Sequence, residues 1–355
     1  MSPAREEIRG IVLTLGAWHD KPWWWPQLAE SPWLPHMGYE RFSFGARKAN
    51  QIGFAQLPAL AWRTWKFLRR ARRTGVHYIF TFEGDATCYL IGLMQYLPLL
   101  RPPRHVILQF ISRENSGTAG ARFKDFVART CLRTVHKVIV SSRSEGDYYL
   151  SRFGWPADRV AFVPLNSDDR QLAQPTGARE EFIVAAGRSY RDYATLAAAV
   201  AGTGIRTIIV CGRSGPGVRD LPPEIELRTE MALDDLLALM ARARANVLPL
   251  QHRRISTGQT VLLQAMGLGQ PVIVTRTAGT EDYIRDGIDG LLVPPSDPAA
   301  LRAAIRRVFD EGTLAERLGT EARATVERRH RPAMYVAAVA AALGCPPAGK
   351  RDSTR

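Results

Sequence analysis

The chain has 355 residues, of which 46% are hydrophobic and 23% charged. This composition is typical of a globular protein and excludes intrinsic disorder, collagen and a coiled-coil rod, and the length predicts two domains. The net charge of +14 is uneven, because residues 1–168 carry +10 (23 Lys and Arg, 13 Asp and Glu) and the remainder +4 (25 and 21). A basic first half indicates an anionic partner, either a nucleic acid, an anionic lipid or a phosphorylated ligand.

The first half alternates segments typical of strands and helices, which predicts an α/β domain with a parallel sheet over residues 1–168. Strands are expected at 8–15, 77–82, 105–111, 137–140 and 160–163, and helices at 51–73, 86–96, 123–135 and 144–153. A long loop rich in Trp and Pro separates the first strand from the first helix.

A polar stretch at 169–181 predicts a linker, and the pattern then restarts as a second α/β domain over 182–330. Strands are expected there at 182–186, 207–211, 225–228, 245–249, 271–275 and 290–293, and helices at 194–201, 233–243, 260–267, 280–286, 298–310 and 313–329. The tail 346–355 is expected to be disordered.

The four cysteines are far apart and form no C-x-x-C motif, which disfavours a disulfide scaffold or a zinc ribbon and favours a reducing cytosol. The apolar run 11–15 is too short for a signal peptide, and the run 86–100 is too short to span a bilayer. We therefore expect a cytoplasmic protein.

Open parallel sheets bind ligands at the carboxyl ends of their strands, and three loops of the second half follow such ends. The first is GRSYRDY (187–193), in which Gly187 allows a sharp exit from the strand and Arg188 and Arg191 supply cations that suit phosphate oxygens. The alternative is a solvated loop whose arginines pair with surface acids.

The second loop, STGQT (256–260), leads into an apolar helix whose first amides predict a phosphate site, with Gln264 one turn further at a ribose hydroxyl. The third loop, RTAGTED (276–282), also precedes an expected helix. The alternative for each is an ordinary helix cap or connecting loop.

Together, residues 186–329 resemble the donor domain of the family 4 retaining glycosyltransferases, which have the GT-B fold. The resemblance is carried by GRSYRDYATL (187–196), by STGQTVLLQAMGLGQPVIVTRTAGTEDYIRDGIDGLLVPPSDPAAL (256–301) and by LGTEARATVE (318–327). It implies two Rossmann-like domains that face each other across a cleft, with a C-terminal helix at about 331–345 that crosses back to the first domain. Residues 137–168 are similar, more loosely, to the end of the family's acceptor domain.

The resemblance also implies roles for the three loops. Arg188 and Arg191 stand where the family places an Arg and a Lys against the donor diphosphate. The other implied contacts are Gly258, Gln259 and Thr260 to the diphosphate, Gln264 to the ribose, and Ser256, Gly279, Thr280, Glu281 and Asp282 to the donor sugar.

The chain departs from the family's E-x7-E signature, because Ser256 and Gln264 occupy the two Glu positions. Gln264 still donates and accepts hydrogen bonds, whereas Ser256 is shorter and neutral. Nucleotide-sugar binding is therefore implied more strongly than sugar transfer.

Several polar residues of the first half lie at expected carboxyl ends of strands, and they include His19, Glu83, Asp85, Arg113 and Glu114. Glu83 and Arg113 are our candidate catalytic residues. His19, Trp23 and Trp24 are expected to face the acceptor, because tryptophan rings in this loop suit sugars or lipid tails. The alternative is a loop whose tryptophans pack on its own apolar residues.

No metal site is evident, and the resemblance implies a family type that generally works without a bound metal. We therefore expect neither a metal nor a permanently bound cofactor, and a nucleoside-diphosphate sugar as the substrate.

The expected helix 51–73 has an apolar face and a basic face, and Trp62 and Trp65 lie among the basic residues. Those basic residues are Arg63, Lys66, Arg69, Arg70, Arg72 and Arg73. Aromatic rings among cations suit the headgroups of an anionic bilayer, here the inner face of the cytoplasmic membrane. The same pattern suits nucleic acid or a solvated surface, but no nucleic-acid-binding motif is present and we expect no nucleic-acid partner.

The sequence thus predicts a GT-B glycosyltransferase that moves a sugar from a nucleoside-diphosphate sugar to a glycan, lipid or lipid-linked acceptor with retention of configuration. A non-catalytic GT-B partner subunit and a GT-B nucleotide-sugar epimerase are the alternatives.

Overall fold

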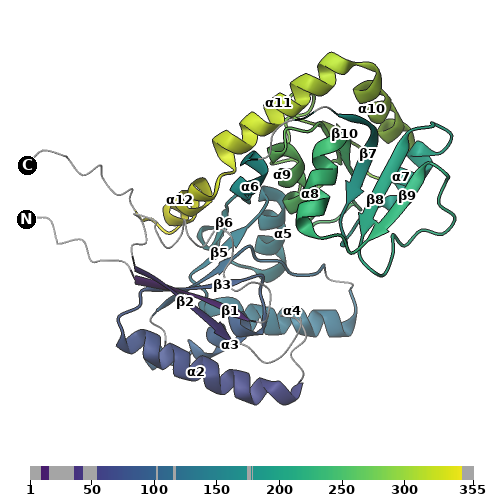
Figure 1. The fold of residues 1–355 in the computed structure, drawn as a ribbon. Coiled ribbons are helices and arrows are strands. Elements are labelled where there is room, and N and C mark those ends of the chain that lie inside the picture. The colour runs from purple at the N-terminus through teal and green to yellow at the C-terminus, as the bar shows by residue number, and fades with distance from the viewer. Residues whose placement is uncertain are drawn as a thin grey trace, which may run out of the picture. The chain divides into compact units, whose positions relative to one another are not determined.

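The computed structural model describes residues 9–15, 36–42, 54–100, 103–114, 117–173, 177 and 179–345. The chain forms two compact units, the first made of residues 1–163 with 335–355 and the second of residues 164–334. Each unit contains one six-stranded sheet, and every pairing within the two sheets is parallel (Figure 1). The expected α/β fold class is confirmed.

The sheet of the first unit has the strand order β2-β1-β3-β4-β5-β6. Its strands are β1 (Arg9–Leu15), β2 (His36–Phe42), β3 (Tyr78–Phe82), β4 (Arg104–Leu108), β5 (Lys137–Val140) and β6 (Val160–Phe162). Its helices are α2 (Leu57–Arg73), α3 (Ala86–Met94), α4 (Ala119–Cys131) and α5 (Arg143–Phe153), with short 3-10 turns η1 (Phe54–Gln56), η2 (Pro98–Leu100), η3 (Leu132–Thr134) and η4 (Ala157–Arg159).

The strands of this sheet are buried on both faces, which explains their continuous apolar sequences. On one face, Leu13 and Ile79 pack with residues of α2 such as Leu60 and Phe67. On the other face, neighbouring residues of the same strands pack with α12 (Pro332–Ala342), whose contacts come from Tyr335, Val336, Val339 and Ala340. Successive strand residues point to opposite faces, so each strand serves two cores. Most of the C-terminal helix therefore packs with the first unit.

The sheet of the second unit has the order β12-β11-β10-β7-β8-β9. Its strands are β7 (Glu180–Ala186), β8 (Arg206–Cys211), β9 (Ile225–Thr229), β10 (Ala243–Leu248), β11 (Val272–Thr275) and β12 (Leu291–Val293). Its helices are α6 (Asp169–Ala173), α7 (Tyr193–Val200), α8 (Leu233–Arg242), α9 (Gln259–Gly267), α10 (Pro298–Asp310) and α11 (Gly312–Arg329). Two apolar cores, one on each face, hold these helices to the sheet.

Three expectations about local structure are wrong. The segment His36–Phe42 is a strand that pairs with β1 along its whole length, although its sequence HMGYERF has no apolar alternation. The expected linker contains the short helix α6. Residues 280–286 form turns instead of a helix, because the buried Thr280 hydroxyl bonds to its own loop: it accepts from the Thr277 amide and donates to the Thr275 carbonyl.

Candidate functional site

The direction in which successive strands are added to the second sheet reverses between β7 and β10, although all strands are parallel. Strands β8 and β9 extend the sheet on one side of β7, and β10, β11 and β12 extend it on the other. Ligands of open parallel sheets bind outside the carboxyl ends of the strands at such a switch point. The loops that leave β7 and β10 therefore define the candidate site, and the loop that leaves β11 lies beside them.

Hydrogen bonds join these three loops into one surface. Arg191 and Leu250 form an antiparallel bridge between the first two loops, and the Gln251 amide donates to the Tyr190 carbonyl at 3.0 Å. The Leu250 amide donates to the Thr275 hydroxyl at 3.0 Å, which ties the second loop to β11. The structure thus brings together loops that are about 60 and 25 residues apart in the sequence.

The third loop approaches the second so closely that only glycine fits at position 279. A Cβ atom on Gly279 would lie 2.7 Å from the Thr257 backbone nitrogen and 2.9 Å from the Thr257 carbonyl oxygen. Backbone atoms cannot yield as the end of a flexible side chain can. Gly279 therefore sets the distance between the second and third loops.

The start of helix α9 is suited to an anion. Gly258 takes the N-cap position with a φ of +88°, and no side chain caps the helix. The first amides of a helix have no partner within it, and they carry its positive dipole end. Two buried side-chain atoms beside them, Oγ1 of Thr257 and Nε2 of Gln259, also have no hydrogen-bond partner in the structure. Together these groups form a set of hydrogen-bond donors that suits a phosphate.

The two arginines of the first loop have different environments. The Arg188 side chain is 67% exposed, and its nearest acid is Glu230 at 3.9 Å. The Arg191 guanidinium instead donates from Nε to the Ala186 carbonyl and from Nη1 to the Ser189 carbonyl, both at 2.9 Å. Burial of this guanidinium lowers the pKa of Arg191. Arg188 is thus the cation that reaches solvent, while Arg191 braces the loop from within.

Two charged residues that the sequence analysis missed lie next to Arg188. Glu230 directly follows β9 and stands between Arg188 and Arg213, each 3.9 Å away. Its backbone φ of +54° is left-handed, as is that of Tyr190 in the first loop. Such strained residues cluster at functional sites. No local sequence signal marks Arg213 or Glu230, because only the strand order brings them to Arg188.

The remaining predicted residues of this unit occupy the same edge in different ways. Ser256 is 5% exposed, and Gln264 is partly buried on the second turn of α9. Thr280 is fully buried and hydrogen-bonded within its loop, as described above. Glu281 is exposed, with Arg276 at 4.0 Å, and Asp282 is partly buried beside it.

The first sheet has its own switch point, between β1 and β3, where Glu83 follows β3. Glu83 has a left-handed φ of +56°, and desolvation together with the nearby Asp85 carboxylate raises its pKa. Asp85 itself is the N-cap of α3, because it accepts hydrogen bonds from the Thr87 and Cys88 amides. The structure therefore gives Asp85 a structural role and leaves Glu83 as the carboxylate at this edge.

Arg113 lies in the loop after β4, and its side chain is exposed. The loop is held by α5: the Arg113 carbonyl accepts from Arg152 at 2.6 Å, and the Ser112 amide donates to the Tyr149 hydroxyl at 2.8 Å. The predicted acceptor-facing residues His19, Trp23 and Trp24 lie outside the described residues.

Within the described part of the chain, no three His, Cys, Asp or Glu side chains are grouped as a metal site. None of the helices described in the structure has the length and apolar character needed to cross a membrane.

Solved structures share this arrangement of two parallel sheets. A glycosyltransferase from Rickettsia africae superposes with a TM-score of 0.69 at 14% identity, covering 94% of this chain and 97% of that one. Anabaena HepE in complex with UDP superposes with a TM-score of 0.70 at 15% identity, covering 95% of this chain and all of the other. The fold is that of the GT-B glycosyltransferases.

The second unit also has similarity at the level of sequence. Residues 183–311 match the family model described as glycosyl transferases group 1. A D-rhamnosyltransferase, WbpZ of Pseudomonas aeruginosa, is 30% identical over 186 residues, which are 50% of this chain and 46% of the relative. Glycogen synthase of Mycobacterium tuberculosis is 35% identical over 89 residues, which are 25% of this chain and 21% of the relative. The chain thus spans less than half the length of these curated relatives.

Proposed function

We propose that this protein is a glycosyltransferase that takes a sugar from a nucleoside-diphosphate sugar. The observation that carries the proposal is the joining of three loops at the switch point of the second sheet, where the uncapped start of α9 lies at the same edge as an exposed arginine. The family match of residues 183–311 supports it. The structural neighbour HepE binds UDP and, in another crystal structure, UDP-glucose.

In this proposal the second unit binds the donor. The amides of Gly258, Gln259 and Thr260 and the exposed Arg188 hold the diphosphate, and Gln264 holds the ribose. Fixed donors aimed at the leaving diphosphate stabilise the charge that develops as the glycosidic bond breaks. Arg191 acts as a positioning residue, because its guanidinium is engaged by the Ala186 and Ser189 carbonyls.

The donor sugar is proposed to lie against Ser256, Gly279 and the turn 280–282. The first unit is proposed to bind the acceptor, with Glu83 and Arg113 as its catalytic candidates. Desolvation and the Asp85 carboxylate raise the pKa of Glu83, which is the direction expected of a carboxyl group that holds a proton for catalysis. Transfer with retention of configuration, and no need for a bound metal, remain part of the proposal by resemblance to family 4.

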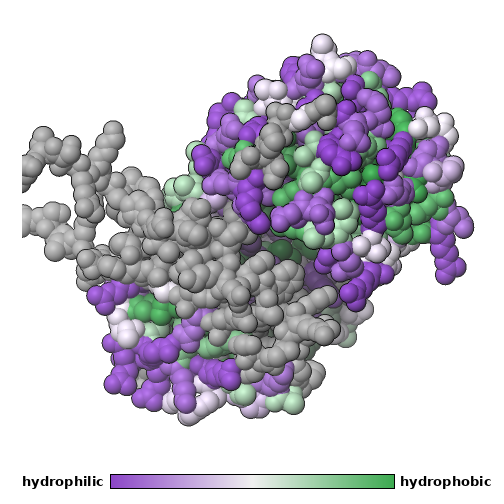
Figure 2. Space-filling model, viewed as in Figure 1, coloured by the Kyte–Doolittle hydropathy of each residue, from purple (hydrophilic) through white to green (hydrophobic). Residues whose placement is uncertain are grey.

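A lipid or lipid-linked acceptor is proposed because the first unit exposes aromatic rings among cations. On α2, Trp62 is 54% exposed and stacks on Trp65 at 4.9 Å, while Lys66 lies 4.9 Å above Trp62. Figure 2 shows mostly hydrophilic residues over α2, at the lower edge of Figure 1, with hydrophobic residues among them. Such a helix suits the interface of an anionic bilayer.

The structure adds a second exposed aromatic pair to this proposal. Phe123 and Phe126 on α4 are 66% and 64% exposed, and Arg122 and Lys124 adjoin them. Helix α3 contacts both α2 and α4, so the three helices are neighbours (Figure 1). We propose that these helices place the protein on the inner face of the cytoplasmic membrane.

The test is thermal unfolding of the full chain with UDP, GDP, dTDP or ADP, each with and without Mg²⁺. A nucleotide at about 100 times its dissociation constant stabilises the folded state by roughly 2.7 kcal/mol. We expect one nucleotide to raise the melting temperature in wild type and in the control Arg317→Ala, whose exposed side chain is on α11, but not in Arg188→Ala. Radiolabelled sugar transfer from the matching donor to membrane lipids then tests the reaction.

The substitution of the family's two Glu residues by Ser256 and Gln264 favours one second candidate, a non-catalytic partner subunit. No stabilisation by any nucleotide would contradict the transferase and support this alternative. Formation of an epimerised donor in the absence of any acceptor would instead identify an epimerase.

A further inference from the structure

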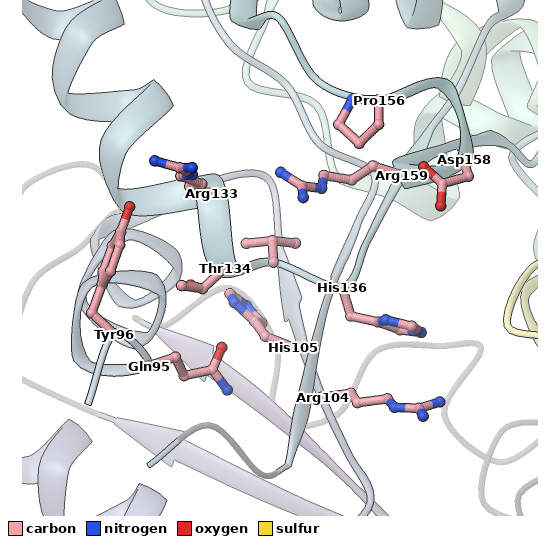
Figure 3. Close-up of a pocket in the computed structure, with 11 residues that line it drawn as sticks. Gln95, Tyr96, Arg104, His105, Arg133, Thr134, His136, Pro156, Asp158 and Arg159 are labelled. Atoms are coloured by element: carbon pink, nitrogen blue, oxygen red, sulfur yellow. The ribbon is translucent and has the colours of Figure 1, made fainter. Parts of the chain in front are cut away.

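A cavity lies in the first unit, at the amino edge of its sheet. Glu83 and Arg113 lie at the opposite, carboxyl edge. The cavity has a volume of about 670 Å³ and opens where β4, β5 and β6 begin (Figure 3). Its lining comes from the end of α3, from η3 and from these strand starts, and consists of Gln95, Tyr96, Arg104, His105, Arg133, Thr134, Val135, His136, Pro156, Asp158 and Arg159. Because β4 runs for five residues, roughly 13 Å separates its two ends. The cavity is therefore distinct from the carboxyl edge of this sheet.

The arginines of this cavity form no ion pair with any residue that the structure describes, although the Asp158 carboxylate is near enough to act on the pKa values of Arg159 and His136. Arg133 and Arg159 form no hydrogen bond through their side chains within the described residues. Among those residues Arg104 donates to a neutral group, the Tyr78 hydroxyl, at 3.3 Å. Asp158 is the one acidic residue of the lining, and its carboxylate lies in no ion pair within the described chain. The lining therefore has a net positive charge.

The cations of the cavity are close enough to affect one another. Desolvation lowers the pKa of His136, and repulsion from Arg104 and Lys137 lowers it further. Desolvation also lowers the pKa of Arg159; the Asp158 carboxylate opposes this shift in part, and Arg133 adds a smaller lowering. An anion bound among these groups would relieve the repulsion and raise the pKa of His136.

A buried donor in the lining also has no partner. His105 is fully buried, and its Nε2 lies 2.8 Å from the Thr81 hydroxyl. Because that hydroxyl accepts from the Cys88 thiol, we assign its own hydrogen to the bond with Nε2 and the imidazole proton to Nδ1. Nδ1 has no hydrogen-bond partner in the structure. Buried polar groups are normally paired, so this one points to a missing acceptor.

We propose that this cavity binds a phosphorylated small molecule. Arg104, Arg133 and Arg159 hold the phosphoryl oxygens, since guanidinium groups match phosphate in bidentate geometry. His105 Nδ1 supplies a further donor to a ligand or to a water that the ligand holds. The volume is within the roughly 300–1,000 Å³ of small-molecule sites and accommodates a molecule of the size of a sugar phosphate. The proposal does not depend on the proposed transferase activity, because none of these residues belongs to the loops of the second unit.

The sequence offers a probe that reports this unit alone. All eight tryptophans lie within residues 18–155, so tryptophan fluorescence follows unfolding of the first unit and not of the second. Trp155 is buried next to Pro156 of the lining and also senses the cavity directly.

The experiment follows tryptophan-detected melting of the full chain during titration with inorganic pyrophosphate or glucose 6-phosphate, at constant ionic strength maintained with NaCl. We expect either ligand to raise the melting temperature of wild type and of Arg188→Ala, which lacks the proposed diphosphate contact in the second unit. Arg133→Ala/Arg159→Ala is expected to weaken binding at least tenfold. The matched control Arg122→Ala, on the exposed surface of α4, is expected to bind as wild type does.

An equal shift in the double variant and in wild type, or no shift in wild type, would overturn the proposal. Melting without ligand and far-ultraviolet circular dichroism establish that the double variant is folded. If it is not, Arg133→Gln and Arg159→Lys are tested singly, and unchanged affinity in both would equally overturn the site. A second readout is the pKa of His136 by NMR, which must rise when pyrophosphate binds.

A phosphoryl group is presented either free or on a lipid headgroup, and sedimentation with vesicles separates the two sources. Binding to phosphatidylglycerol vesicles that pyrophosphate displaces, and that is weaker for the double variant than for Arg317→Ala, would identify a headgroup. Vesicle binding that is equal in the two variants, together with a glucose 6-phosphate shift lost only in the double variant, would identify a soluble ligand.

Discussion

The carboxyl edges of the two sheets are built by different means. In the second unit, three loops bind to one another through backbone contacts, such as the Arg191–Leu250 bridge and the approach of Gly279 to Thr257. In the first unit, the loop after β4 is held by side chains of α5, a helix about 40 residues later, through Tyr149 and Arg152.

This difference explains why one edge has a recognisable sequence and the other does not. Backbone contacts at close range require particular residues, such as glycine at 258 and 279, and these residues form a recognisable sequence motif. Many different pairs of residues can supply the side-chain hydrogen bonds by which another helix holds a loop. The loops of the second unit are therefore constrained by local backbone geometry, whereas the loop after β4 is constrained by side chains from another helix.

The largest effect is expected where the backbones of the second unit touch. Gly279→Ala places a Cβ 2.7 Å from the Thr257 nitrogen and must push the second and third loops apart. We expect nucleotide affinity to fall about 100-fold, because a shift of this size misplaces the helix amides. Isothermal titration measures the affinity, and Gly312→Ala, where a Cβ would lie in ordinary contact 4.0 Å from the end of the Arg244 side chain, is the control. Wild-type affinity in Gly279→Ala would show that the loop contact does not shape the site.

The next effect concerns the first unit and its dependence on pH. Burial lowers the pKa of His105 to about 3, below the ordinary value of 6.5. At pH values between these two pKa values, His105 binds a proton in the unfolded chain but not in the folded unit. The free energy of unfolding therefore decreases as the pH falls from 6.5 towards 3, by about 1.4 kcal/mol per pH unit.

Replacement of His105 by Gln removes this contribution, so the variant should lose less stability than wild type between pH 6.5 and 4. Urea unfolding followed by tryptophan fluorescence measures the difference in the first unit. Glu83 and Asp85 have raised pKa values and act in the opposite direction, but they are common to both proteins and cancel in the comparison. Parallel pH profiles would contradict the assignment of His105 as a buried neutral group.

A smaller effect separates the two arginines of the donor loop. Arg191→Ala leaves the Ala186 and Ser189 carbonyls without their donors, so we expect the second unit to lose about 2 kcal/mol of stability. Arg188→Ala removes only an exposed side chain and should leave stability unchanged while weakening nucleotide binding. Thermal melting followed by circular dichroism tests these different roles of Arg191 and Arg188. Equal destabilisation by the two substitutions would refute them.

The smallest effect is expected on the exposed aromatic rings of the first unit. Phe126→Ser and Trp62→Ser should each weaken binding to phosphatidylglycerol vesicles about fivefold, since each removes an apolar group that inserts at the interface. Leu227→Ser, at a 42% exposed apolar residue of the second unit, is the control. Vesicle binding that is the same in all three variants would remove the membrane from the proposal.

The sequence by itself determined the alternation of strands and helices, because each strand of a doubly covered parallel sheet must be apolar throughout and each helix must present an apolar face. It also determined the three loops of the second unit, since glycines and helix starts are specified by neighbours in the chain. It did not determine β2, whose sequence HMGYERF is held as a strand only by pairing with β1. Nor did it determine that residues 280–286 would turn, because that follows from the burial of one hydroxyl.

The tertiary structure alone decided which charges meet. Strand order puts Glu230 between Arg188 and Arg213, and the close packing of α3 against α4 and η3 brings Gln95 near Arg133 and the starts of three strands. These residues lie far apart in the sequence, and each alone is an ordinary surface cation or polar group. Local sequence fixes local conformation through backbone geometry and burial, whereas the electrostatic field of a site depends on distances that exist only after the sheet has formed.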